Sequence, residues 1–225
     1  TLNWRIKYYG MDQNTTVFQF ASLSFDSSVE DIFCALSCGG TLIIPEDKKR
    51  LNLKYVENML FRYEVTQLML VPSVYELFLQ RIKKLPKSMK EVILAGENIS
   101  KELLKRHFEA NESVRLFNEY GPTENSVCST VAELKKDDEI NIGKPIDGVE
   151  IAILNDHLQD VNKGEKGVLY LCGKGIAHGY INNFAATKEK FFKLRDRDMY
   201  CTGDIVYMDE QSNLVYVGRS DNEIK

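Results

Sequence analysis

The first half of the chain alternates short strand-like runs with stretches whose apolar residues recur at the spacing of an amphipathic helix. The pattern predicts strands at 16–20, 41–45, 67–71, 91–96 and 114–117. It predicts one helix over 27–38 and another over 101–110. Between them it predicts a helix that begins near residue 52 and one that begins after residues 72–73. Short strands separated by helices of about 10 to 13 residues are typical of a parallel sheet that is covered on both faces. The first half is therefore predicted to be an α/β layer structure.

The pattern changes after about residue 132, where apolar and polar residues alternate with the period of two that marks half-buried strands. Candidate strands lie at 149–154, 167–172, 204–209 and 213–218, separated by turns rich in Gly, Asn and Asp. This half is predicted to be a smaller, antiparallel, barrel-like lobe. We expect one subdomain at 1–132 and a second at 133–218, with the charged segment 134–139 at the seam.

Composition narrows the class of protein. Of the 225 residues, 44% are hydrophobic and 28% charged, which is enough to bury a sizeable core. A net charge of −4, with 29 basic residues spread along the chain, argues against a nucleic-acid partner. The apolar runs are far shorter than the roughly 18 residues of a membrane span, and the first residues do not resemble a signal peptide. We expect a soluble, cytoplasmic protein with no membrane partner.

The cysteines and histidines give no sign of a metal or disulfide site. The five cysteines form no CxxC pair and no cluster with the three histidines, so reduced, mostly buried thiols are expected. His107 and His157 are predicted to be solvated surface residues.

Residues that could bind a ligand lie in three loops that follow predicted strands. These loops are 24–28, 95–98 and 118–124, and in an open parallel sheet the carboxyl ends of strands gather ligand-binding loops at one edge.

The loop NEYGPTE at 118–124 is the most informative of the three. Tyr120 offers a face for a purine, Gly121 permits a tight turn, Thr123 can bond a phosphate and Glu124 can bind a divalent cation. This set predicts a nucleotide with a metal ion. The alternative is an ordinary turn whose tyrosine packs in the core.

Five segments together resemble a known family. FDSS, NEYGPTE, GVLYLCGKGIAHGYIN, YCTGD and GRSDNEIK occur in the order of the core motifs of adenylate-forming enzymes. Over essentially its whole length the chain is similar to the central part of a nonribosomal peptide synthetase adenylation domain. The resemblance implies a ligase that uses ATP and Mg²⁺ to convert an amino acid into an aminoacyl adenylate and pyrophosphate, in antibiotic biosynthesis.

The resemblance also implies partners. The acyl group would pass to a phosphopantetheine thiol on a carrier protein, beside condensation domains of the same synthetase. The alternatives are a ligase similar to acyl-CoA synthetases, and a non-catalytic folding or binding module.

The resemblance implies a role for each residue that matches a family motif. Thr123, Glu124 and Arg219 would be catalytic, with Thr123 at the phosphate, Glu124 on the magnesium and Arg219 at the ribose or phosphate. Tyr120 would stack on the adenine, and Asp204 would bind the ribose hydroxyls. Residues 219–225 would begin a hinge at Asp221. The implied cofactor-binding residues are Asn118, Tyr120, Gly121, Asp204, Arg219 and Lys225.

The amino-acid pocket follows in the same way, with Asp26 matching the aspartate that pairs with the substrate's α-ammonium group. The implied pocket residues are Asp26, Ser27, Glu30, Met69, Ile93, Ala95, Gly96, Glu119, Val127 and Cys128. Asp26 and Glu30 lie four residues apart at a helix start, where like charges repel by a few tenths of a kcal/mol unless a cation lies between them. We therefore expect a basic substrate, lysine or ornithine first, with its distal ammonium near Glu30 or Glu119. Alternatively, Glu30 only complements the helix dipole.

The chain also departs from the family pattern. It has no Gly/Ser/Thr-rich phosphate loop and ends just past the hinge motif, so we expect negligible activity from this segment alone. His178 stands where the family usually has arginine.

Overall fold

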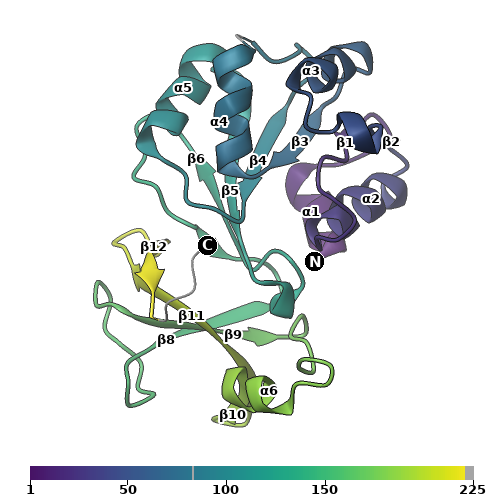
Figure 1. The fold of residues 1–225 in the computed structure, drawn as a ribbon. Coiled ribbons are helices and arrows are strands. Elements are labelled where there is room, and N and C mark those ends of the chain that lie inside the picture. The colour runs from purple at the N-terminus through teal and green to yellow at the C-terminus, as the bar shows by residue number, and fades with distance from the viewer. Residues whose placement is uncertain (83, 221–225) are drawn as a thin grey trace. The chain divides into compact units, whose positions relative to one another are not determined.

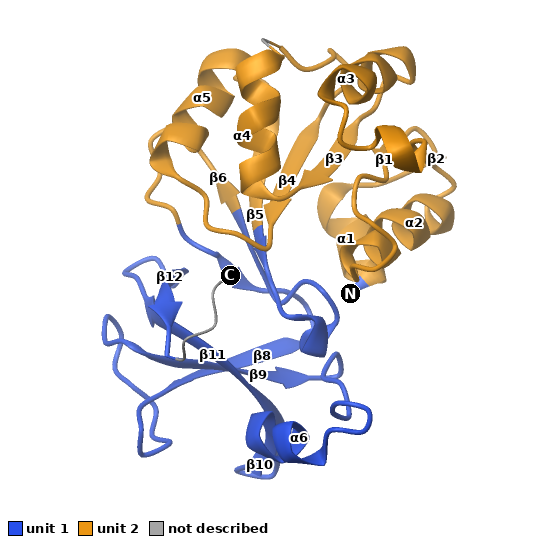
Figure 2. Ribbon diagram, viewed as in Figure 1, with its two compact units in different colours: residues 1, 119–132, 141–225 blue, residues 2–118, 133–140 orange. Residues whose placement is uncertain are grey.

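The computed structural model describes residues 1–82 and 84–220. These residues form two compact units (Figure 2). Residues 2–118 and 133–140 form one, here called the α/β unit, and the β unit holds residue 1, residues 119–132 and the chain from 141 onward. The chain passes between the two units after residues 1, 118, 132 and 140.

The α/β unit is built as the hydrophobic pattern predicts. Its helices are α1 (Leu2–Tyr9), α2 (Ser27–Ser37), α3 (Leu53–Arg62), α4 (Pro72–Arg81) and α5 (Lys101–Asn111), with a 3₁₀ turn η1 (Asp47–Lys49). Its strands are β1 (Thr16–Phe18), β2 (Thr41–Ile43), β3 (Gln67–Leu70), β4 (Glu91–Ala95) and most of β5 (Arg115–Tyr120). The pairs β1–β2, β1–β3 and β3–β4 are parallel, which confirms the predicted fold class.

The sheet has seven strands in the order β2-β1-β3-β4-β5-β6-β7. Its later strands are β6 (Thr130–Leu134) and β7 (Lys144–Pro145), and β5 and β6 each run through a boundary between the units. In Figure 1, α4 lies beside α5 and packs on β4, while α2 packs against β1 and β2 with α1 beside it. The sheet is thus flanked by helices.

Local sequence signals set several helix ends. The Asn52 side chain accepts a hydrogen bond from the Tyr55 backbone amide, and Ser100 accepts one from Leu103, as N-cap residues do. Pro72 stands in the first turn of α4, where its missing amide costs nothing. The sequence pattern did not predict α1, η1, β6 or β7, and β5 extends past residue 117 to Tyr120.

His107 corrects another prediction. It is fully buried in α5, not solvated: Tyr75 Oη and His107 Nδ1 are 2.6 Å apart, and Nε2 is 2.8 Å from the Val114 carbonyl oxygen. Since that carbonyl can only accept, Nε2 carries the proton and the Tyr75 hydroxyl donates to Nδ1. His107 shares the buried face of α5 with Leu103 and Leu104, and the charged residues next to it in the sequence concealed this.

The β unit contains a five-stranded sheet in the order β10-β11-β9-β8, with β12 paired to β11. The elements are β8 (Val149–Leu154), β9 (Gly167–Gly173), α6 (Phe184–Lys190), β10 (Phe191–Leu194), β11 (Arg197–Met208) and β12 (Leu214–Arg219). All of its strand pairs are antiparallel, as expected. The sequence pattern did not predict α6 or β10.

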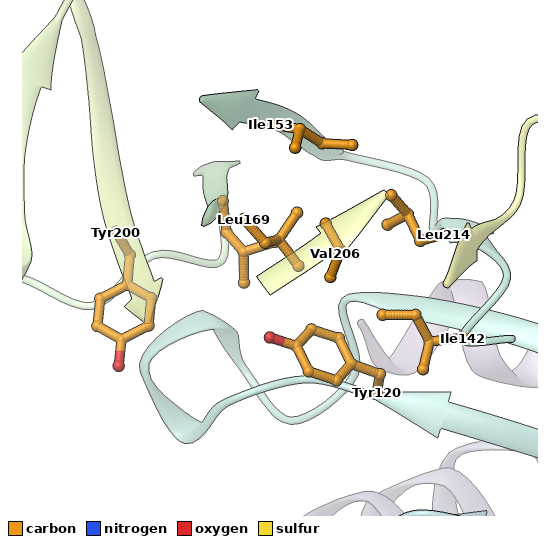
Figure 3. Close-up of a cluster of buried hydrophobic side chains, with 8 residues drawn as sticks. Tyr120, Ile142, Ile153, Leu169, Tyr200, Val206 and Leu214 are labelled. Carbon is orange, nitrogen blue, oxygen red and sulfur yellow. The ribbon is translucent and has the colours of Figure 1, made fainter. Parts of the chain in front are cut away.

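The larger of two apolar clusters in the core of the β unit is shown in Figure 3. It consists of Tyr120, Ile142, Ile153, Leu169, Leu171, Tyr200, Val206 and Leu214. The two tyrosines carry hydroxyls into this apolar setting, and a buried hydroxyl needs a hydrogen-bond partner. For Tyr120 that partner is the carboxylate of Asp204.

Two further observations complete the fold. The five cysteines are all unbridged thiols, three of them buried, as predicted. Within residues 1–82 and 84–220, no helix combines the length and the apolar character needed to cross a membrane.

Candidate functional site

The segment 118–124 is not wholly a loop. Asn118, Glu119 and Tyr120 are buried residues of β5, and the chain turns only at Gly121, before the 3₁₀ turn η2 (Thr123–Asn125). The Tyr120 carbonyl accepts a hydrogen bond of 2.8 Å from the Ser129 amide, which closes the turn. The strand therefore holds Tyr120 rigidly, and the turn exposes Thr123 beyond it.

Gly121 is required by close backbone approach. A Cβ at this position would lie 2.0 Å from the Val127 carbonyl oxygen and 2.7 Å from the Ser129 nitrogen, well inside contact distance. Only glycine lets the two arms of the turn come this close. Ser126 and Val127 have positive φ, of 58° and 71°, so the far side of the turn is also tightly constrained.

Tyr120 and Asp204 form the centre of the site within the β unit. The Tyr120 hydroxyl donates to Asp204 Oδ2 over 2.5 Å, and Arg219 Nη1 donates to Asp204 Oδ1 over 3.2 Å. Burial, and next the charge of Asp204, raise the pKa of the Tyr120 hydroxyl, so it stays protonated and acts as a donor. Three predicted site residues from distant parts of the sequence thus meet directly.

An irregularity in β11 places Asp204. The register between β11 and β9 shifts between Cys201 and Ile205, and Gly203 has φ +74°. Thr202 spans the shift, because its hydroxyl donates to the Leu169 carbonyl at 2.8 Å and accepts from the Asp204 amide at 3.0 Å. A bulge of this kind redirects one side chain out of the regular ladder. Asp204 is only 2% exposed as a result.

Glu124 is held by a second tyrosine. Its Oε1 accepts a hydrogen bond of 2.5 Å from the Tyr180 hydroxyl, and its backbone carbonyl accepts one of 2.8 Å from the Ala177 amide. Ser126 adds a bond of 2.8 Å to the Gly175 carbonyl. The segment 175–180 is therefore tied to η2 at three points.

Tyr200 completes this group. Burial raises the pKa of the Tyr200 hydroxyl, and hydrogen bonding to Tyr180 and the charge of Glu124 raise it further. The Tyr200 hydroxyl therefore remains protonated near the Glu124 carboxylate.

Glu124 is suited to bind Mg²⁺ together with ligands from a nucleotide and water, not as part of a site made only of protein side chains. Among the described residues no three His, Cys, Asp or Glu side chains cluster as metal ligands. Mg²⁺ is commonly bound through one or two carboxylates together with phosphates of the substrate and water. Glu124 is half-exposed and can supply one such carboxylate.

The predicted pocket residues of the α/β unit lie on the sheet and on α2. Met69 pairs with Ile93 across β3 and β4, and Ala95 lies two residues further along β4, so the three share one face of the sheet. Gly96 follows with φ +84°. Asp26 is the N-cap of α2, is half-buried and makes no side-chain cap bond. Ser27 begins the helix.

Glu30 differs from the expectation. Arg5 of α1 donates from Nη1 to Glu30 Oε2 at 2.9 Å, and both side chains are 1% exposed. Arg5 Nη2 also lies 3.7 Å from Met69 Sδ, and its guanidinium is 5.1 Å from the centre of the Tyr9 ring. The chain's own arginine therefore already supplies a cation to Glu30, so the proximity of Asp26 and Glu30 does not require a cationic substrate.

The remaining predicted residues divide between the units. Glu119, Val127 and Cys128 belong to the β unit, whereas Asp26, Glu30 and Met69 belong to the α/β unit. Lys225 and Asp221 lie outside the described residues.

Sequence reasoning missed Arg5, Tyr180 and Tyr200. Tyr180 and Tyr200 do lie in two of the segments that resemble family motifs, at 167–182 and 200–204, which was the available signal. Arg5 had none, since α1 itself was not predicted.

Comparisons with known proteins show the family of this chain. The family model described as AMP-binding enzyme matches residues 1–181. Bacitracin synthase 3 of Bacillus licheniformis is 42% identical over 229 residues, and the match covers 100% of this chain and 4% of that protein. Tyrocidine synthase 3 of Brevibacillus parabrevis is 32% identical over 232 residues, covering 100% of this chain and 4% of that protein. The chain thus spans a small part of these relatives.

Solved structures give the same result. The Vibrio cholerae adenylation domain AlmE, in complex with glycyl-adenosine-5'-phosphate, matches with a TM-score of 0.90 and 27% identity over 100% of this chain and 44% of that one. The fused adenylation–PCP didomain NpsA-ThdA from Klebsiella oxytoca matches with a TM-score of 0.84 and 26% identity, over 97% of this chain and 42% of that one. The chain belongs to the AMP-binding enzyme family and is similar to adenylation domains of nonribosomal peptide synthetases.

Proposed function

We infer from membership of the AMP-binding enzyme family that this chain carries part of a site in which ATP activates the carboxylate of an amino acid. The observation that carries the proposal is the junction of Tyr120, Asp204 and Arg219, which unites three separate motifs around one buried carboxylate. In the reaction a carboxylate oxygen of the amino acid bonds to the α-phosphorus of ATP. The bond from that phosphorus to the bridging oxygen breaks, and pyrophosphate leaves with the electron pair.

Each residue of the β unit has a role suited to that chemistry. Asp204 accepts hydrogen bonds from Tyr120 and Arg219. A carboxylate has about four acceptor sites, so Asp204 can also accept from the ribose hydroxyls. Tyr120 is only 8% exposed among apolar side chains, and we assign its ring to stacking on the adenine, with Asn118 at the edge of the base. Arg219 keeps a guanidinium next to Asp204 and can reach ribose or phosphate. Thr123 is exposed and would donate to a phosphate.

Glu124 would hold Mg²⁺, which when bound neutralises charge on the phosphates. The chain's own contribution there is a carboxylate that Tyr180 keeps in one orientation. Preorganised charges of this kind stabilise the transition state because they need not reorient as charge develops.

The substrate is proposed to be an amino acid whose α-ammonium group pairs with Asp26. We further propose a basic side chain, now on the strength of Glu119 alone, which is a buried carboxylate among the proposed pocket residues. Glu30 no longer supports this, because Arg5 already neutralises it. The acyl group would then pass to a phosphopantetheine thiol of a carrier domain, a partner that the adenylation–PCP didomain among the similar structures supports.

The decisive experiment is amino-acid-dependent exchange of pyrophosphate into ATP in the full-length protein that contains this segment, with the twenty amino acids and ornithine tested separately. Activity with a basic amino acid is expected. Preference for an apolar amino acid would overturn the basic substrate but leave amino-acid activation standing. No exchange with any amino acid, in a protein that is folded, would overturn the function.

Asp204→Asn tests the nucleotide site directly. The variant removes the charge that accepts from Tyr120 and Arg219, so ATP affinity should fall about 10-fold or more, in line with hydrogen bonds to charged groups. The matched control is Asp198→Asn on the same strand, whose ion pair to Lys193 is exposed on both sides. Isothermal titration with ATP is the measurement, and equal affinities for the two variants would contradict the assignment.

A further inference from the structure

Glu124 has a neighbour that no motif-based role explains. The Tyr180 hydroxyl donates to Glu124 Oε1 over 2.5 Å, from a segment 56 residues further along the chain. The bond is charge-assisted, since the acceptor is a carboxylate, and such bonds are shorter and stronger than those between neutral groups. It therefore constrains the carboxylate more than an ordinary surface contact would.

The backbone around this bond fixes Tyr180 as well. The Tyr180 amide donates to the Thr187 hydroxyl at 2.8 Å, and the Thr187 hydroxyl in turn donates to the Asn183 carbonyl at 2.8 Å. Gly179 has φ +134°, and a Cβ there would lie 2.4 Å from the Thr187 Cγ2. The Tyr180 ring also packs edge-on against Phe191, with ring centres 5.4 Å apart. The hydroxyl is thus held in place from the side of α6.

The chemistry of the donor matters as much as its position. The donor is a phenol, which carries no charge while it donates its proton in a hydrogen bond. A neutral phenol orients a carboxylate without neutralising it, so the negative charge of Glu124 stays available to a cation. An arginine in the same place would remove that charge.

We propose that Tyr180 is a positioning residue for Glu124: it holds one carboxylate oxygen so that the other faces a nucleotide-bound divalent cation. The proposal rests on the proposed function, since it assigns Tyr180 a part in the same nucleotide site. Groups that hydrogen-bond a metal ligand typically contribute 10- to 100-fold to metal affinity.

The test replaces the hydroxyl alone. Tyr180→Phe keeps the ring against Phe191 and removes the donor. In the full-length protein, the Mg²⁺ concentration for half-maximal pyrophosphate exchange should rise about 10-fold, with little change in the rate at saturating Mg²⁺. A readout without turnover is Mn²⁺ binding in the presence of ATP, followed by electron paramagnetic resonance, which should weaken by the same factor.

Two controls separate positioning from a structural effect. Tyr207→Phe removes a hydroxyl from β11 in the same unit and should leave the Mn²⁺ affinity unchanged. The double variant Tyr180→Phe/Glu124→Gln should bind Mn²⁺ no more weakly than Glu124→Gln alone, since Tyr180 acts only through Glu124.

The outcomes are distinguishable. Unchanged or tighter Mn²⁺ binding by Tyr180→Phe, with normal exchange in the unsubstituted protein, would overturn the inference but leave the proposed function intact. Additive losses in the double variant would also overturn it. Absence of exchange in the unsubstituted protein would refute the proposed function instead.

Discussion

The two units differ in the kind of group that donates hydrogen bonds to their carboxylates. In the α/β unit, Glu30 is fully buried and paired with Arg5, and Glu91 is buried and paired with Arg115. In the β unit, Glu124 is half-exposed and held by the neutral hydroxyl of Tyr180. An arginine neutralises a carboxylate inside the fold, whereas a phenol orients it and leaves its charge. The comparison teaches that the identity of the donor separates a structural carboxylate from one prepared for a ligand.

Asp204 is intermediate between these cases. It accepts from the Tyr120 hydroxyl and from Arg219, and it is nearly as buried as Glu30. Arg219 is the last residue of β12, whereas Arg5 lies within a helix. We expect Asp204 to combine a structural contribution with a binding one.

The largest expected effect is on the Arg5–Glu30 pair. Arg5→Met leaves Glu30 as an uncompensated buried charge, which should lower the free energy of unfolding by about 3–5 kcal/mol. Urea unfolding followed by circular dichroism measures this. The double variant Arg5→Met/Glu30→Gln should recover much of the loss, because the buried charge is gone. A loss below about 1 kcal/mol in the single variant would show that Glu30 is not structural.

A smaller effect is expected at Asp204. Tyr120→Phe keeps the ring in the apolar cluster but removes one hydrogen bond to the carboxylate, while Arg219 remains. The free energy of unfolding should fall by about 1.5–3 kcal/mol, the range for a bond to a charged group. The same urea titration reports it. No measurable change would mean that the phenol does not help to hold Asp204, and the contrast drawn above would fail for this residue.

The smallest expected effect is the pH dependence of stability that the buried, neutral His107 produces. Burial lowers the pKa of His107 from its usual 6.5, so the unfolded chain takes up a proton at higher pH than the folded one. The stability contribution is therefore complete above about pH 6.5 and is lost as pH falls below it.

Urea midpoints between about pH 7.5 and pH 5 would measure this dependence. His107→Gln can still donate to the Val114 carbonyl and accept from Tyr75, but does not titrate, so its stability should fall less steeply with acid. Equal slopes for the variant and the unsubstituted protein would contradict the assignment of His107 as a buried neutral group.

Much of this protein followed from the sequence alone. Strands β1 to β5 and helices α2 to α5 follow from local periodicity and caps such as Asn52 and Ser100, because burial of one face imposes its own spacing on the residues. The junction of Tyr120 with Asp204 was foreseen only through resemblance, since 84 residues separate the two.

Tertiary structure alone decided which charges are neutralised. Whether Glu30 meets Arg5 or a ligand depends on how α1 packs on α2, and no local pattern in either helix encodes that contact. The same holds for His107, whose hydrogen-bond partners come from α4 and from the segment after α5. It also holds for Tyr180, which reaches Glu124 only because Ala177 and Gly175 bring its segment to η2. Periodicity reports the side of an element that is buried, but a hydrogen-bond partner is set by the element that packs there.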